Sequence, residues 1–225
     1  MDEVVMPDRF AAPRIVGAVA LAYAMSMFSQ NMLFGISGAP DYSDSIGLVL
    51  TYHAENRGVL AVAFGLEAVN MCLLLLLVTG LNGLVRRSGR AGADWSRLAV
   101  VGGATLSALF ALTVATHIAV VLAADGLTEP TPAFELMWHF HAAVFALALP
   151  ALGVTFIGAA LAAYTGGFTR TWQRLLGVTG GSLLLLAGLG NIAIADGSPL
   201  VLLGVLGLFM WLVWVAATGL RLVRM

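Results

Sequence analysis

The chain has 225 residues, of which 60% are hydrophobic and only 10% are charged, and its formal net charge is −1. Soluble domains carry about 25% charged residues, so this chain is too apolar to cover itself with a solvated surface, and we expect a lipid bilayer around it. The small net charge argues against nucleic acid as a partner, because little of the chain can neutralise a phosphate backbone. The single cysteine, Cys72, excludes an intrachain disulfide and a cysteine metal cluster.

Six stretches of the chain contain the roughly 20 apolar residues that are needed to cross a hydrocarbon core. They cover residues 14–36, 58–82, 98–123, 136–164, 173–194 and 199–220. The first stretch is longer than the apolar core of a secretory signal, so we expect it to remain as an uncleaved helix. The sequence therefore predicts an all-α fold, in which residues 1–225 form a single integral membrane domain of six transmembrane helices.

The connections between these stretches alternate in charge. The two termini and the connections 83–97 and 165–174 carry the arginines Arg9, Arg14, Arg86, Arg87, Arg90, Arg97, Arg170, Arg174, Arg221 and Arg224. The other connections contain only Arg57 beside the acids Asp41, Asp44, Glu55, Asp125, Glu129, Glu135 and Asp196. Because short cytoplasmic loops carry an excess of basic residues, this pattern predicts a cell-membrane protein with both termini in the cytoplasm.

The longest outer connection, residues 37–57, follows the first predicted helix. Its centre, IGLVLTY (46–52), is apolar enough to lie on the membrane interface or to re-enter the membrane as a short segment. The whole connection is too short to form a separate soluble domain.

The C-terminal half contains a recognisable series of residues. A helix ends in a short turn with an arginine and a tryptophan, and a Leu-Leu-Gly-Val run opens the next helix; the matching residues are Gly167, Arg170, Trp172, Leu175, Leu176 and Gly177. Together with PRIVGA (13–18) and GLEAVN (65–70), this series resembles the bacterial six-helix membrane proteins of domain-of-unknown-function family 4386. The resemblance implies six helices and no particular activity, and it includes neither the long outer connection nor the histidines.

Several polar residues lie inside the predicted spans. Counting 1.5 Å per residue from Gly58, Glu67 lies about 14 Å deep, near the middle of the membrane, and Asn70 follows on the same helix face. An acidic residue at that depth costs about 2.5–3.5 kcal/mol on insertion scales, so we expect Glu67 to point into the bundle. Gln30 and Asn31 lie in the outer third of the first helix.

All four histidines lie in or beside the outer half of the membrane. His53 lies just outside the second span, His117 lies about 10 Å deep, and His141 lies about 9 Å deep. His139 and His141 are two residues apart, so they point to roughly opposite sides of one helix. We expect His141 to face inward near His117, and His139 to lie at the membrane interface beside Trp138.

These residues predict a polar pocket in the outer half of the bundle, formed by Glu67, Asn70, His117, His141, Gln30 and Asn31. One hypothesis is a small non-enzymatic membrane protein that binds a small ligand there or serves as a subunit of a larger membrane complex. The alternative is a redox protein in which His117 and His141 hold haem b, or in which His117, His141 and His53 bind a transition metal. The sequence contains no H-x-x-x-H, H-E-x-x-H or G-x-S-x-G motif, so whether the protein is an enzyme stays open.

Overall fold

The computed structural model of the chain describes residues 12–89 and 91–225, which form eight α-helices and no β-strand. The helices are α1 (Pro13–Ser37), α2 (Ile46–Glu55), α3 (Arg57–Arg87), α4 (Ala93–Ala124), α5 (Pro132–Thr165), α6 (Thr171–Leu189), α7 (Asn191–Ala195) and α8 (Val201–Val223). The predicted all-α fold is therefore confirmed. Arg9 and Arg90, which contribute to the predicted charge pattern, lie outside the described residues.

Five of the described helices are long and apolar enough to cross a membrane, namely α1, α3, α4, α5 and α8. Each begins and ends within a few residues of a stretch predicted from the sequence, except that α3 and α4 continue further into the connection at 83–97. These five helices identify the chain as a multi-pass membrane protein. Cys72, on α3, is exposed on the outside of the bundle.

The stretch 173–194, predicted as one transmembrane helix, is divided in the structure. Helix α6 ends at Leu189, and the short α7 begins at Asn191, because Gly190 leaves the helical conformation with φ −95° and ψ 26°. Helix α6 also opens with polar residues and contains four glycines, which lower its hydropathy. It is consequently absent from the five helices that are apolar enough to span.

The apolar centre of the long outer connection forms the ten-residue helix α2. The hydroxyl of Ser45 caps its N-terminus by accepting a hydrogen bond from the backbone N–H of Leu48 at 3.4 Å. Val49 and His53 are buried against the end of the bundle, and the hydroxyl of Tyr52 lies 2.6 Å from that of Ser37 at the end of α1. Helix α2 is thus packed onto the protein, because its apolar side meets α3 and α4.

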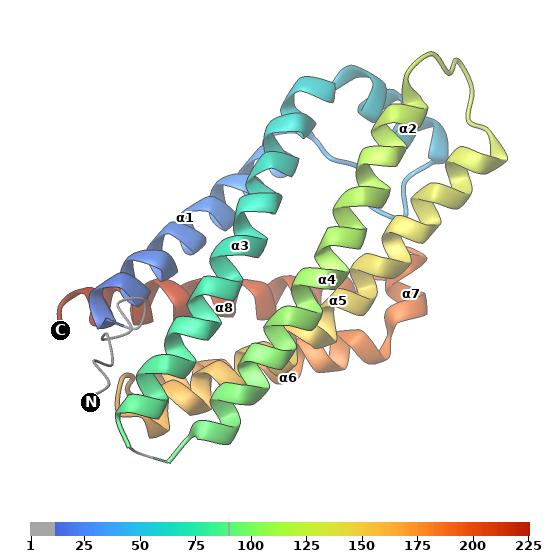
Figure 1. Cartoon of the computed structure of the whole chain (residues 1–225). Helices are drawn as coiled ribbons and strands as arrows, with labels where there is room; N and C mark the ends of the chain where they lie inside the picture. Colours follow the sequence, from blue (N-terminus) through green and yellow to red (C-terminus); the bar gives the residue numbers. More distant parts are fainter. Residues whose placement is uncertain (1–11, 90) are drawn as a thin grey trace, which may run out of the picture.

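The long helices form a bundle with two distinct ends. Figure 1 shows α3, α4 and the first part of α5 side by side. Helices α6 and α8 contact each other and run at an angle to these three helices. The start of α1, the α3–α4 turn, the α5–α6 connection and the end of α8 gather at one end of the bundle. Helix α2 and the α4–α5 turn lie at the other end, whereas α7 lies beside α5, between the two ends. The arginine-rich connections therefore share one end of the molecule, and the acidic α1–α2 and α4–α5 connections share the other.

Glycines allow close contact between helix backbones. A Cβ atom on Gly17 of α1 would lie 2.8 Å from the carbonyl oxygen of Gly219 in α8. A Cβ on Gly153 of α5 would lie 2.7 Å from the carbonyl oxygen of Gly181 in α6. In lipid, where apolar surface gains little by burial, such close approach is a main source of helix association.

Candidate functional site

Three histidines from three helices meet at the end of the bundle where α2 lies. The ring centroids of His117 (α4) and His141 (α5) are 4.3 Å apart, and Nε2 of His53 (α2) lies 2.9 Å from Nε2 of His117. The prediction that His141 faces inward near His117 is confirmed, because the His141 side chain is buried. His139 points outward as expected, with its side chain 58% exposed and 3.8 Å from Glu135. Trp138, the residue before His139, is buried beside the other histidines.

Backbone carbonyls define which nitrogen of two of these rings carries the proton. Nδ1 of His53 lies 2.6 Å from the carbonyl oxygen of Val49, and Nδ1 of His141 lies 3.1 Å from that of Thr113. Because a carbonyl oxygen only accepts, each Nδ1 is the donor, and the Nε2 of each neutral ring is an acceptor. His117 must then donate from its own Nε2 to His53. Burial lowers the pKa of His53, which keeps this ring neutral, although its bond to Val49 opposes the shift.

Aromatic side chains surround the histidine rings. Trp138 stacks on His141 with centroids 5.4 Å apart, and Phe64 meets His117 edge to face at 4.8 Å. Tyr42, from the connection between α1 and α2, lies 5.2 Å from Trp138 and 5.9 Å from His141. Burial, and secondarily the charge of Glu67, raises the pKa of Tyr42, so its phenol stays protonated.

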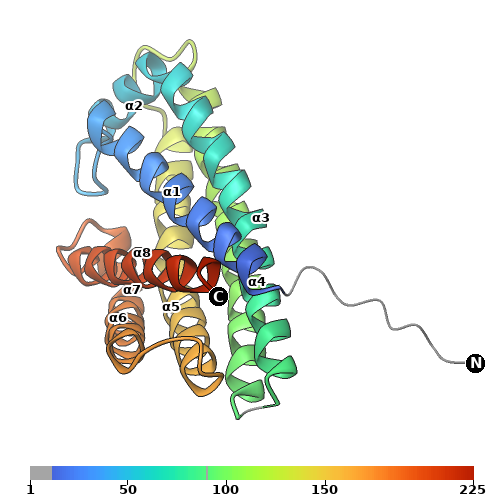
Figure 2. The ribbon, with the colours of Figure 1, turned by 90° about the vertical axis from the view of Figure 1, so that its left-hand side faces the viewer.

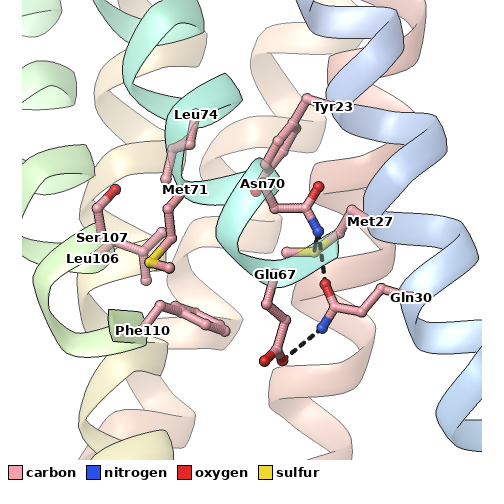
Figure 3. Close-up of a pocket in the computed structure, with 10 residues that line it drawn as sticks. All are labelled: Tyr23, Met27, Gln30, Glu67, Asn70, Met71, Leu74, Leu106, Ser107 and Phe110. Atoms are coloured by element: carbon pink, nitrogen blue, oxygen red, sulfur yellow. Dashed lines mark hydrogen bonds between the residues drawn. The ribbon is translucent and has the colours of Figure 1, made fainter. Parts of the chain in front are cut away.

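Glu67 belongs to a second polar group, formed with two amides. Nε2 of Gln30 (α1) donates to Oε1 of Glu67 (α3) at 2.7 Å, and Nδ2 of Asn70 donates to Oε1 of Gln30 at 2.6 Å. Figure 3 shows this chain of bonds between the two helices. The prediction that Glu67 points into the bundle is confirmed, because it is 8% exposed and bonded to the helix that carries Gln30.

Two acceptors of this group have no hydrogen-bond partner among the described residues. They are Oε2 of Glu67 and Oδ1 of Asn70, and both are buried. In Figure 3 the carboxyl group of Glu67 points away from Leu74, toward the start of α3. Unpaired buried acceptors are costly, so their presence beside a cavity marks a place where a ligand can gain hydrogen bonds.

A chamber of about 620 Å³ joins the two polar groups. The lining combines polar and aromatic side chains with an apolar wall of aliphatic residues from α5 and α8. The lining includes five residues of the predicted pocket: Gln30, Asn31, Glu67, His117 and His141. Asn70 lines a smaller neighbouring cavity of about 20 Å³ together with Gln30 and Glu67. The structure therefore brings all six predicted residues to one connected region.

The structure also adds residues that the sequence prediction missed. Tyr42 and the apolar residues of α8, among them Val201, Leu202 and Val205, line the chamber. Trp138 could have been found, because it precedes His141 by three residues and so shares its helix face. Tyr42 and α8 gave no comparable signal, because their position depends on how distant segments pack.

The histidine arrangement does not fit a haem held between His117 and His141. Two axial imidazoles bind a metal at about 2 Å each and face one another end-on across it. These two rings instead lie against each other at 4.3 Å with 42° between their planes. The described residues also contain no group of three or more His, Cys, Asp or Glu side chains arranged to hold a metal ion. A metal at His53, His117 and His141 stays a prediction from the sequence.

Comparison with known proteins adds no assignment: the chain matches no protein-family model, no curated protein and no solved structure.

Proposed function

We propose that the protein is a non-enzymatic, multi-pass membrane protein that binds a small amphiphilic molecule in the chamber between α1, α4, α5 and α8. The observation that carries the proposal is the chamber itself, whose volume of about 620 Å³ lies within the usual range of ligand pockets. Such pockets are mainly apolar with a few polar groups in fixed positions, and this chamber has that composition. Glu67, His117 and His141 are the polar groups that would orient a ligand.

The apolar wall favours a ligand that enters from the bilayer. Leu202 and Val205 of α8 line the chamber, yet they are 64% and 51% exposed, so the chamber is open beside them. Figure 2 shows that the end of α8 lies beside the start of α1, and that the two helices separate toward the start of α8. An amphiphile could place its apolar part along α8 and its polar part against α4 and α5.

The proposed placement in the membrane has six crossings and both termini in the cytoplasm. Helices α6 and α7 together would provide the sixth crossing, because α6 begins at the arginine-rich end and α7 lies beside α5, away from that end. The arginine-rich end would face the cytoplasm, which places the opening of the chamber in the outer half of the membrane. This placement makes the cell membrane the proposed location.

Membership of domain-of-unknown-function family 4386 is a further proposal, supported by the series from Gly167 to Gly177 and by the residues 13–18 and 65–70. Association with other membrane subunits is compatible with ligand binding, because the exposed apolar residues on the outside of the described bundle can face either lipid or another subunit. The proposed ligand site lies within one chain and requires no partner.

The test is to fill the chamber and to identify what the protein retains. Val205→Trp places a large ring in the chamber, whereas Leu206→Trp places the same ring on a neighbouring residue that is equally exposed, at 53%, and is not part of the lining. Native mass spectrometry of protein released from mild detergent should show a small molecule bound to the natural chain and to Leu206→Trp, but not to Val205→Trp. A bound molecule that is equally abundant in all three proteins would contradict the proposal.

A further inference from the structure

We infer that the chamber selects lipophilic organic cations, such as protonated amines with a large apolar group, over anions and neutral molecules of the same size. This inference rests on the proposed function and specifies the chemical class of its ligand. It is carried by three features of the chamber: an incompletely paired acidic group, a lining without arginine or lysine, and a surrounding set of aromatic rings.

The acidic group is Glu67, which lines the chamber and is more than nine-tenths buried. Gln30 donates one hydrogen bond to Oε1, while Oε2 has no partner among the described residues. A carboxylate removed from water needs an opposite charge or several donors to offset its lost hydration. A cation in the chamber supplies that charge, and a protonated amine also supplies a donor for Oε2.

The orientation of the neighbouring amides reinforces this preference. A carboxylate only accepts, so Gln30 must present Nε2 to Glu67 and Oε1 to Asn70. Asn70 then uses its Nδ2 donors on Gln30 and on the sulfur of Met27, at 2.6 and 3.6 Å, and its Oδ1 stays unpaired. The unpaired atoms at this end of the site are therefore acceptors, which attract donors and positive charge.

The charges along the chamber also favour a cation. Among the described residues of the lining, the acids are Asp41 and Glu67, and none is an arginine. Lysine is absent from the whole sequence. His141 uses its Nδ1 proton on the carbonyl of Thr113 and, when neutral, offers an acceptor at Nε2. An anion would consequently meet carboxylates and acceptors without a permanent positive charge to pair with.

Aromatic rings supply the second part of the recognition. The lining contains the side chains of Phe34, Tyr42, Phe110, Trp138 and Phe145. Tyr42 contacts Trp138 and Phe145, with centroids 5.2 and 5.8 Å away, so these rings form a continuous surface. Faces of aromatic rings attract cations, and sets of such rings are used elsewhere to bind alkylammonium groups. The aliphatic residues of α8 would then contact the apolar part of the ligand.

The test uses two ions of nearly the same size and shape and of opposite charge, tetraphenylphosphonium and tetraphenylborate. Binding of each radiolabelled ion is measured by equilibrium dialysis in a non-ionic detergent, and the Val205→Trp value is subtracted to isolate binding in the chamber. We expect tetraphenylphosphonium to bind to the chamber of the natural chain. Its binding to Glu67→Gln should be at least tenfold weaker. Tetraphenylborate should show no chamber binding. Glu67→Asp keeps the charge and should bind better than Glu67→Gln. Glu55→Gln, which removes one charge from an exposed residue outside the chamber, is the matched control and should change nothing.

The results that would contradict the preference for cations differ from those that would contradict the proposed function. Chamber binding of tetraphenylborate that equals or exceeds that of tetraphenylphosphonium would overturn the inference while leaving the ligand chamber in place. Tetraphenylphosphonium binding that is unchanged in a well-folded Glu67→Gln protein, or absent from the natural chain, would overturn it as well. The proposed function would fail instead if the mass spectra showed no small molecule that is bound to the natural chain and lost in Val205→Trp.

Discussion

Nε2 of His53 and Nε2 of His117 lie 2.9 Å apart and join the short helix α2 to the long helix α4 across 64 residues of sequence. His53 is 1% exposed, and its other ring nitrogen bonds to Val49 within α2. The histidine therefore connects the outer helix to the bundle with both ring nitrogens in use. The same helix follows the segment that carries Tyr42, so this bond also holds one side of the chamber in place.

Loss of this bond should loosen α2. His53→Ala leaves the N–H of His117 without its partner and opens a cavity, which should cost about 1–3 kcal/mol of stability for the unpaired group alone. Hydrogen exchange should become faster in α2 and in the Tyr42 segment before it changes in α4. His139→Ala is the control, because that side chain is 58% exposed and should leave exchange unchanged. Equal exchange in both variants would show that the bond does not hold α2.

The attachment of α2 should also depend on pH. Burial lowers the pKa of His53 in the folded protein from the ordinary value of 6.5. Its stabilising contribution is therefore complete above about pH 6.5 and is lost as the pH falls below that value, because the unfolded or detached form takes up the proton first. The protection factors of the α2 amides, in which the slower intrinsic exchange at low pH is already divided out, should fall from pH 7 to pH 5 more in the natural chain than in His53→Asn. An identical pH response in the two proteins would contradict this role of His53.

The sequence predicted much of the architecture because a membrane imposes strong patterns. Runs of apolar residues located α1, α3, α4, α5 and α8, and the cost of burying a charge placed Glu67 inside the bundle. The helix spacing of His139 and His141 was sufficient to distinguish the inward residue from the outward one. The break at Gly190 was harder to predict, because single glycines are tolerated in membrane helices.

The chamber could be predicted only in part. Its polar residues stand out from an apolar background, whereas Val205 and Leu202 resemble every other aliphatic residue in the chain. Whether such a residue faces lipid, a neighbouring helix or a cavity depends on the crossing of α1 and α8, which close glycine contacts determine. Tyr42 lies in a connection without a repeating pattern, so the sequence alone does not place it beside Trp138.

The Glu67 network predicts different effects for two substitutions at the same residue. Glu67→Gln keeps the shape and an acceptor for Nε2 of Gln30, so it should fold normally. Glu67→Leu leaves the amide donor of Gln30 unpaired and should destabilise the protein by about 1–3 kcal/mol. Thermal unfolding followed by fluorescence-detected size exclusion measures the difference. Equal melting temperatures for the two variants would indicate that the bond to Gln30 contributes nothing to the bundle.

The proposed orientation predicts which connections an impermeant thiol reagent can reach. In a Cys72→Ala background, Thr128→Cys in the α4–α5 turn should be labelled from outside intact cells. Asp94→Cys, at the arginine-rich end, should react only after the cells are opened, although the Asp94 side chain is 95% exposed. Labelling of Asp94→Cys in intact cells, with Thr128→Cys protected, would reverse the orientation.

The packing of the histidines predicts an optical property. Because the rings of His117 and His141 contact each other instead of facing across a metal, the purified protein should show no Soret band in its absorption spectrum. The spectrum should stay unchanged in His117→Ala. A Soret band in the natural chain that disappears in His117→Ala would establish haem binding and contradict a chamber that holds an amphiphile.

A density map of the natural protein in lipid nanodiscs at a resolution that shows side chains tests the ligand chamber most directly. We predict continuous non-protein density in the chamber, with its polar end within hydrogen-bond distance of Glu67 or His141 and the remainder along Leu202 and Val205 of α8. The same map of Val205→Trp should lack this density, and that of Leu206→Trp should retain it. A chamber that is closed by its own side chains, or filled by a helix of another subunit, would contradict the proposed ligand binding.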